Sequence, residues 1–173
     1  MEQFIIELKT KLAGEQVIQD EMLCYAYSTD ASMYRMVPKV VVVVHSEREV
    51  IEVIKLASLH GVKLTFRAAG TSLSGQAVTD QVLVLLSNAS WLKYTIHADG
   101  SQISLEPGII GAQANNYLLP YKRKIGPDPG SISAAKIGGI VANNSSGMCC
   151  GTSQKSYATL AHLRAVFANG DVL

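Results

Sequence analysis

The chain has 173 residues, of which 48% are hydrophobic and 17% are charged, and its formal net charge is +1. This composition is typical of a globular protein with a sizeable core and excludes a disordered chain, while the near-neutral charge argues against nucleic-acid binding. The longest strongly apolar run, Val40–Val44, is too short to span a membrane, and the three cysteines lack the spacing of a disulfide framework or a metal site. We therefore expect a cytoplasmic protein without a bound metal ion.

The N-terminal residues predict one helix followed by a less regular segment. Four apolar side chains recur at helical spacing within residues 2–13, and Gly14 follows as a stop signal. Residues 15–37 mix aromatic residues with turn formers and show no clear period. We assign residues 1–37 to a partly helical lead-in and residues 38–173 to the domain proper.

A strand, a helix and a second strand are predicted next. Val40–Val44 is a β-branched run that indicates a strand buried on both faces. Ser46 can cap the following helix while Glu49 reaches back to it, as in a capping box. That helix ends at Gly61, and residues 62–66 indicate the second strand. A strand–helix–strand unit of this kind predicts two parallel strands.

The segment FRAAGTSLSGQAVT, residues 66–79, directly follows the second strand, and ligands of open α/β sheets bind at that end of a strand. It holds two glycines, four hydroxyl side chains and one arginine, but no carboxylate. Backbone N–H groups and hydroxyls of such a loop can bind phosphate oxygens, and Arg67 adds positive charge. Neither a P-loop nor a Rossmann fingerprint is present. A flexible connector would have a similar composition, so that alternative stays open.

The elements that follow are shorter. Residues 82–86 indicate a strand, residues 93–108 a hairpin that turns at Asp99-Gly100, and residues 108–119 a short helix. Residues 160–173 indicate a strand that enters an Asn169-Gly170 hairpin. Because the return strand of that hairpin would have only three residues, we expect the chain to be a fragment of a longer protein.

A second glycine-rich segment, GPDPGSISAAKIGGIVANNSSGMCCGT, spans residues 126–152 and includes a short helix or turn. Its six glycines suit a place where the backbone approaches another group closely, and its Asn and Ser side chains can hydrogen-bond a flat heteroaromatic ring. Residues 129–170 contain no Asp or Glu, as expected of a face that binds an anion. Close packing of two backbones in a core would also explain the small residues, and this alternative stays open.

The two glycine-rich segments resemble those of a known flavoprotein family. FRAAGTSLSGQAV resembles the pyrophosphate loop of the vanillyl-alcohol oxidase / p-cresol methylhydroxylase superfamily, and PDPGSISAAKIGGIVANNSSG is similar to its second FAD-binding segment. The match is closest to the D-2-hydroxyacid dehydrogenase branch, which includes D-lactate dehydrogenase, the glycolate oxidase flavin subunit and D-2-hydroxyglutarate dehydrogenase. NNSSGMCCGT is similar to long bacterial members that fuse the flavoprotein to an iron–sulfur domain.

This resemblance implies an α+β fold: a two-lobed FAD-binding domain with a small βαβ lobe, about residues 38–90, and then a mixed β-sheet lobe with flanking helices, about residues 91–173. It implies FAD as the cofactor, with the pyrophosphate nearest Gly70, Thr71, Ser72 and Gly75. The cofactor-binding residues that it implies are Arg67, Ala68, Ala69, Gly70, Thr71, Ser72, Leu73, Gly75, Gln76, Pro127, Asp128, Pro129, Gly130, Ser131, Ser133, Gly138, Gly139, Asn143, Ser146 and Gly147. Backbone N–H groups near Gly138-Gly139 are further candidate donors.

The resemblance also implies a reaction, in which a D-2-hydroxyacid is oxidised to the 2-oxoacid by hydride transfer to the flavin. The catalytic residues are expected beyond Leu173, so none is assigned within this chain. The electrons would pass to an iron–sulfur domain or another acceptor, and Cys24, Cys149 and Cys150 lack the spacing to ligate a cluster. Attachment at the inner face of a membrane stays open beside the cytoplasmic setting.

The sequence departs from some relatives at two places. Thr71 stands where berberine-bridge-type relatives carry a histidine that bonds covalently to the flavin, so we predict noncovalent FAD. Cys149 and Cys150 are interpreted as buried, inert small residues rather than flavin-linking or redox thiols.

Two alternative functions stay open. The first is a flavoenzyme similar to UDP-N-acetylenolpyruvoylglucosamine reductase, which would require NADPH. The second is a non-redox module whose glycine-rich loops hold a nucleotide phosphate. Flavin absorbance would exclude the module, and reduction of that flavin by a hydroxyacid or by NADPH would separate the two enzymes.

Overall fold

The computed structural model describes residues 1–173, which form two units. One unit contains Met1–Ser87 together with Leu163–Leu173, and the other contains Asn88–His162. The expected division into a lead-in (1–37) and two successive lobes (38–90 and 91–173) remains a prediction. In the two observed units, residues 1–37 belong to the first unit, the boundary follows Ser87, and residues 163–173 also pack with the first unit.

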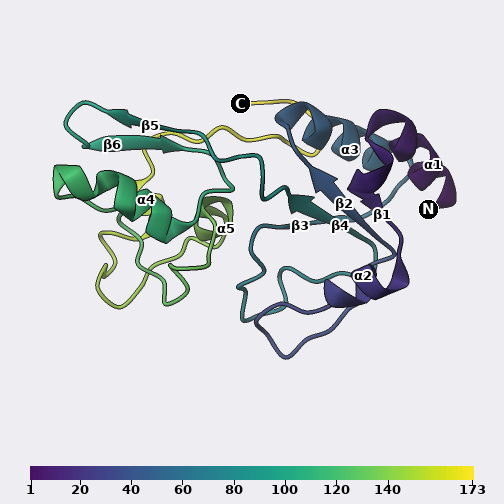
Figure 1. The fold of residues 1–173 in the computed structure, drawn as a ribbon, viewed down its shortest axis with the longest axis horizontal. Coiled ribbons are helices and arrows are strands. Elements are labelled where there is room, and N and C mark those ends of the chain that lie inside the picture. The colour runs from purple at the N-terminus through teal and green to yellow at the C-terminus, as the bar shows by residue number, and fades with distance from the viewer. The chain divides into compact units, whose positions relative to one another are not determined.

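The first unit is built on a four-stranded sheet with the order β1-β2-β4-β3 (Figure 1). The strands are Val17–Ile18 (β1), Val40–Val44 (β2), Leu64–Arg67 (β3) and Val82–Leu86 (β4). The predicted strands β2 and β3 are parallel, as expected, but β4 lies between them and pairs with both. Side chains of β2 and β4 form most of the buried core of this sheet, since apolar residues on them point to both faces.

Three α-helices accompany this sheet: Glu2–Lys11 (α1), Glu21–Ala26 (α2) and Glu47–Leu59 (α3), with a 3-10 turn at Gly14–Gln16 (η1). The predicted helix α3 begins as expected, because Ser46 Oγ accepts a hydrogen bond from the Glu49 N–H. The other hydrogen bond predicted for the capping box, from the Ser46 N–H to the Glu49 carboxylate, does not form. The carboxylate accepts from the His45 N–H instead, at 2.7 Å. The helix is followed by Gly61 at φ +62°, the left-handed conformation that glycine adopts most easily.

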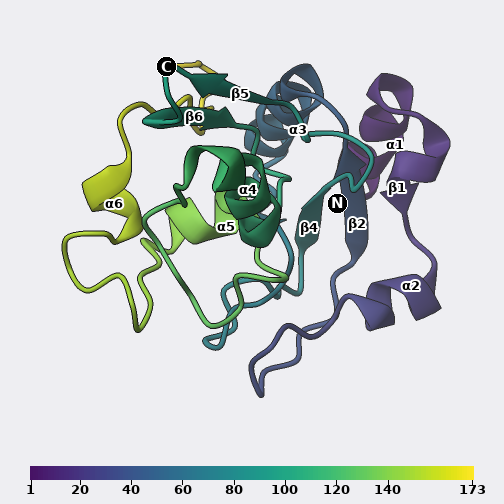
Figure 2. The ribbon, with the colours of Figure 1, turned by 60° about the vertical axis from the view of Figure 1, so that its left-hand side comes forward.

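The second unit contains an antiparallel hairpin of Tyr94–His97 (β5) and Gln102–Leu105 (β6). Its helices are Gly111–Leu118 (α4), Ile137–Ala142 (α5) and Ser156–Thr159 (α6), with a 3-10 turn at Leu119–Tyr121 (η2). In both views α4 and α5 lie on one side of the hairpin (Figure 2). Tyr94 of β5 stacks on Tyr117 of α4 with their ring centroids 3.9 Å apart.

The predicted α+β fold class, with a mixed sheet and flanking helices, is confirmed. The mixed sheet, however, is the one in the first unit, where β1 is antiparallel to β2 and the other pairs are parallel. The second unit contains only the β5–β6 pair, because its other expected strand does not form. None of the helices is long and apolar enough to cross a membrane.

The strand expected at residues 160–167 is wrong. Only one isolated bridge forms there, between Val166 and Val172, although the Asn169-Gly170 turn is present, with Gly170 at φ +84°. The side chains of residues 157–164 are exposed, and no neighbouring strand pairs with them. A strand is stabilised by its ladder partner, so apolar residues alone do not suffice here.

Candidate functional site

The first glycine-rich segment is a loop over residues 68–81 that follows the carboxyl end of β3. Gly70 and Gly75 have φ values of +73° and +69°, which side-chain-bearing residues rarely adopt. A Cβ atom at Gly75 would also lie 2.8 Å from Tyr34 Cδ2. Both glycines are therefore required by the path of the loop.

The loop presents a run of unused hydrogen-bond donors. The backbone N–H groups of residues 69–73 donate no hydrogen bond within the structure. Ser72 Oγ is used inside the loop, where it accepts from the N–H groups of Ser74 and Gln76 and donates to Gln76 Oε1 at 2.7 Å. Consecutive N–H groups beside the Thr71 hydroxyl are the donor set that phosphate oxygens require. The loop therefore fits the pyrophosphate of a dinucleotide.

Arg67 occupies a different position from the one expected. Its guanidinium donates through Nη1 to the backbone carbonyls of Thr29, at 2.6 Å, and Tyr27, at 3.3 Å, and it lies 5.8 Å from the Tyr27 ring centroid. Burial lowers the pKa of Arg67, while the charges of Asp30 and Tyr27 act in the opposite sense. The positive charge is thus directed at the lead-in segment.

A carboxylate from that segment reaches the loop, although residues 66–79 themselves contain none. Asp30 accepts hydrogen bonds from the N–H groups of Ser32, at 2.9 Å, and Ala77, at 3.4 Å. Burial raises the pKa of Asp30, but the hydrogen bonds from Ser32 and Ala77 and the charge of Arg67 outweigh it, so the pKa lies below its ordinary value. The sequence pattern did not indicate this contact, because 47 residues separate Asp30 from Ala77.

In the second segment, α5 begins with a close backbone contact. The N–H groups of Ile137 and Gly138 donate to the carbonyls of Ile109 and Pro107, at 2.8 and 2.9 Å. A Cβ atom at Gly138 would lie 2.8 Å from Pro107 Cβ. Gly138 therefore serves backbone packing within its own unit, and its N–H is not available as the expected donor. The Gly139 N–H makes no hydrogen bond and remains a candidate.

The two ends of the second segment lie side by side. The Asp128 N–H donates to the Ser146 carbonyl at 3.2 Å, and a Cβ atom on Gly147 would lie only 1.7 Å from the Asp128 carbonyl oxygen. The predicted residues 127–130 and 146–147 are thus brought together within one unit. Gly130, in contrast, faces open space.

Polar side chains around this contact stabilise the turn after α5. Buried Ser156 lies with its Oγ within hydrogen-bond distance of the carbonyls of Ile140, at 3.1 Å, and Ser145, at 2.8 Å. Asn144 Oδ1 accepts from the Tyr157 N–H at 3.0 Å. Cys150 is buried, as expected, and donates to the Gly147 carbonyl, so it has a packing role here. The expected burial of Cys149 is wrong, because this residue is exposed.

Lys136 is a residue whose position the sequence analysis did not predict. It precedes α5, is buried, and donates from Nζ to Asn88 Oδ1 at 2.8 Å within the second unit. Burial lowers the pKa of this ammonium group. The flanking small and apolar residues, AAKIGG, were the only signal that could have indicated a buried lysine.

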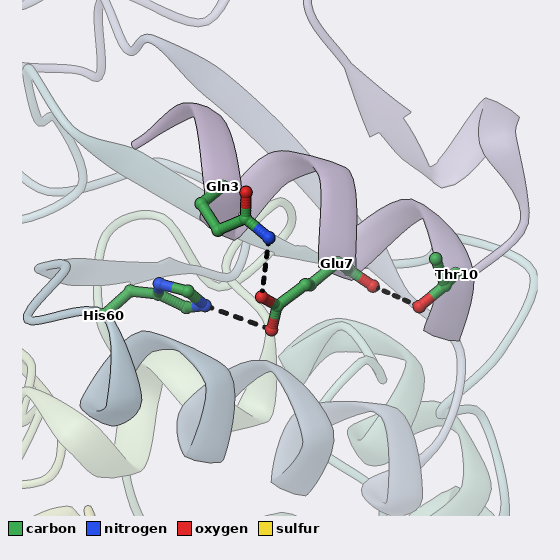
Figure 3. A network of polar contacts seen from close by, with 4 residues as sticks. All are labelled: Gln3, Glu7, Thr10 and His60. Atoms are coloured by element: carbon green, nitrogen blue, oxygen red, sulfur yellow. Dashed lines mark hydrogen bonds and ion pairs between the residues drawn. The ribbon is translucent and has the colours of Figure 1, made fainter.

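Two histidines, His60 and His97, make polar contacts that connect secondary-structure elements. His60 lies 3.1 Å from the Glu7 carboxylate, which also accepts from Gln3, so that this network joins α1 to the end of α3 (Figure 3). His97 contacts Ser104 across the β5–β6 pair at 2.8 Å. No group of three His, Cys, Asp or Glu side chains in the structure could hold a metal ion.

Comparisons with known proteins identify the family of the chain. The family model described as "FAD binding domain" matches residues 38–173. D-2-hydroxyglutarate dehydrogenase of Haemophilus influenzae is 24% identical over 180 residues, a match that covers 100% of this chain and 18% of that protein. Glycolate oxidase subunit GlcD of Escherichia coli is 28% identical over 148 residues, covering 84% of this chain and 30% of that protein. The chain thus spans less than a third of the length of these relatives.

A solved structure supports the fold. p-Cresol methylhydroxylase matches with a TM-score of 0.80 at 16% identity, over 99% of this chain and 34% of that one. Together with the family match over most of the chain, this confirms the resemblance seen in the two glycine-rich segments. The chain belongs to the FAD-binding domain family.

Proposed function

We propose that the chain is the FAD-binding part of an oxidoreductase that converts a D-2-hydroxyacid, namely D-lactate, glycolate or D-2-hydroxyglutarate, to the 2-oxoacid. The family match and the names of the curated relatives support this reaction class. The observation that carries the proposal is the run of unused N–H donors at residues 69–73. FAD supplies the hydride acceptor, and the chain binds and orients it.

In this proposal the two glycine-rich segments have separate tasks. The N–H groups of residues 69–73 and the Thr71 hydroxyl hold the pyrophosphate, whose negative charge meets no carboxylate within the loop itself. Residues 127–133 and 138–147 bind the remainder of the cofactor. The Gly139 N–H and the exposed side chain of Ser146 are donors that the second segment offers.

Substrate binding and proton transfer are assigned to parts of the enzyme outside these residues. This assignment is the one that the family resemblance implies, and the chain covers 18% and 30% of the two relatives. An iron–sulfur domain or another acceptor would take the electrons.

The reaction is tested with the enzyme that contains this chain, purified with its flavin under anaerobic conditions. D-lactate, glycolate, D-2-hydroxyglutarate and NADPH are added in turn. We expect one of the hydroxyacids to bleach the visible flavin absorbance and NADPH to leave it unchanged. Bleaching by NADPH alone would favour the reductase, and a preparation without flavin absorbance would favour the non-redox module.

The pyrophosphate assignment is tested with two glycine variants that both place a side chain at a positive φ. They differ in that the added Cβ atom would meet the Arg67 guanidinium at Gly70 but nothing within 4 Å at Gly61. Gly70→Ala and Gly61→Ala both place alanine at a positive φ, +73° and +62°, at a cost of about 1–2 kcal/mol each. Only Gly70 lies in the loop. We expect Gly70→Ala to raise the Kd for FAD about tenfold or more, since a displaced N–H donor loses about 1–2 kcal/mol of binding. Equal Kd values for the two variants would exclude the loop from the cofactor site.

A further inference from the structure

The lead-in segment Tyr27–Ser32 precedes the region that matches the family model, yet it contacts the first loop at three points. At the start of the loop, Arg67 donates to the carbonyls of Tyr27 and Thr29. In the middle, the Gly70 carbonyl accepts from the Ala31 N–H at 3.1 Å. Near the end, the Ala77 N–H donates to the Asp30 carboxylate. The loop is thus fixed along its length by one short stretch of chain.

These contacts matter because the loop has no backbone ladder of its own. Residues 68–80 make no backbone–backbone hydrogen bond with one another, and the Ser72 and Thr79 hydroxyls accept local hydrogen bonds within residues 68–81. Ordering a free backbone costs about 1–2 kcal/mol per residue. A loop that is already ordered avoids this cost when it binds a ligand.

Arg67 and Asp30 are suited to hold this arrangement. One nitrogen of the guanidinium, Nη1, donates to both carbonyls, those of Tyr27 and Thr29. Asp30 is itself oriented by Ser32, whose N–H and hydroxyl both donate to Oδ1. The opposite charges of Asp30 and Arg67 also offset part of the cost of burying each.

We propose that Arg67 and Asp30 are positioning residues of the cofactor site, which act by fixing the donor run at residues 69–73 in its binding conformation. This inference rests on the proposed role of that loop in holding the pyrophosphate. It extends the site beyond the family-matched region, to residues 27–32.

The test uses the enzyme that contains this chain, stripped of FAD. The variants are Arg67→Met, Arg67→Lys and Asp30→Asn, with Ser28→Ala as the matched control. Ser28 lies in the same segment, and its buried hydroxyl has no hydrogen-bond partner, so its removal leaves all three contacts intact. Loop order is measured by the rate of chymotrypsin cleavage after Leu73, whose side chain is 78% exposed. FAD affinity is measured by titration, and thermal unfolding reports on the fold.

We expect Arg67→Met and Asp30→Asn each to speed cleavage at Leu73 and to raise the Kd for FAD roughly tenfold. Chymotrypsin cleaves the opened loop and FAD binds the ordered loop, so a larger open fraction changes both measurements. Arg67→Lys, which keeps a cationic donor, should recover part of both losses, and Ser28→Ala should match the wild type. The thermal midpoint controls for a general loss of fold, which would also speed cleavage at other sites.

Two results would overturn the inference in distinguishable ways. An unchanged cleavage rate at Leu73 in Arg67→Met and Asp30→Asn would show that these residues do not fix the loop, while the pyrophosphate assignment could still stand on the Gly70→Ala result. Faster cleavage with an unchanged Kd would show that loop order is irrelevant to FAD, and would remove both this inference and the proposed role of the loop.

Discussion

At the scale of single residues, Gly147 is the position where the backbone leaves the least space. Its missing side chain allows the Asp128 carbonyl oxygen to come within 1.7 Å of the place that a Cβ atom would occupy. We expect Gly147→Ala to lower the free energy of unfolding by about 1–3 kcal/mol, because backbone must move to admit the methyl group. Urea denaturation followed by circular dichroism measures this loss.

Gly130 provides the control for this prediction, since a Cβ atom there would meet nothing within 4 Å. Gly130→Ala should leave stability unchanged or raise it by about 0.4–1 kcal/mol, because alanine restricts the unfolded chain. If both alanine variants were equally stable, the close contact between Asp128 and Gly147 would not exist in solution.

These glycines also show how far the sequence could predict the site. Their density correctly indicated close backbone approach, but it could not name the approaching group. Gly138 packs against Pro107, and Gly147 packs against the backbone of Asp128, both within the same unit. Gly130 faces open space. The run at residues 69–73 was left with unused donors, as was the Gly139 N–H, and unused donors cannot be recognised without knowing every other contact.

At the scale of elements, the sequence predicted best where a run of apolar residues was long. The strands β2 and β4 and the helix α3 were found because their burial pattern extends over five residues or more. β1 was missed because it has only two residues, Val17–Ile18. The contacts of Arg67 with the lead-in were missed because they join residues 38 and 40 positions apart, and no local pattern records such a pairing.

The pairing of α1 with α3 gives a pH-dependent prediction (Figure 3). Hydrogen bonds from Gln3 and His60, together with the charge of His60, lower the pKa of Glu7 below its ordinary value of 4.5. A carboxyl group whose pKa is lower in the folded state stabilises the fold above its ordinary pKa and loses that contribution as the pH falls through the folded value. We therefore expect Glu7→Gln to be less stable than the wild type near neutral pH.

The difference between Glu7→Gln and the wild type should shrink as the pH falls below 4.5, since the wild-type carboxyl then becomes protonated. Urea denaturation of both proteins across this acidic range measures it. Glu15→Gln is the control, because Glu15 makes no ion pair or side-chain hydrogen bond in the structure. A stability difference for Glu7→Gln that did not vary with pH would contradict the assigned interaction.

At the scale of the whole molecule, the chain leaves the first unit after Ser87 and returns to it at Leu163. The returning segment is tied to α3 by Arg164, whose guanidinium donates to both carboxylate oxygens of Glu47, at 2.7 and 3.0 Å. These residues are 117 positions apart, and the sequence therefore predicted that residues 163–173 belong with the second lobe, which precedes them directly in the chain. Local patterns reveal elements, but they do not reveal which unit a late segment rejoins.

Whether the FAD is bound covalently depends on every reactive side chain near it, so this question also belongs to the scale of the whole molecule. Thr71 in the first loop carries a hydroxyl, which is a weak nucleophile without a neighbouring base. Cys150 is buried, with its Sγ on the carbonyls of Gly147 and Gly151, whereas Cys149 is exposed. We therefore expect acid precipitation of the holoenzyme to release all of its FAD into the supernatant.

Absorbance of the supernatant and of the redissolved pellet measures this release, and Cys149→Ser serves as the control because it removes the one exposed thiol among these residues. Both proteins should release their flavin completely, since a cofactor held by hydrogen bonds is lost when the fold is lost. Flavin retained in the wild-type pellet but released from Cys149→Ser would identify Cys149 as a covalent attachment site. In that case the second glycine-rich segment would have to hold the reactive ring of the cofactor through a bond, and the expectation of noncovalent FAD would be wrong.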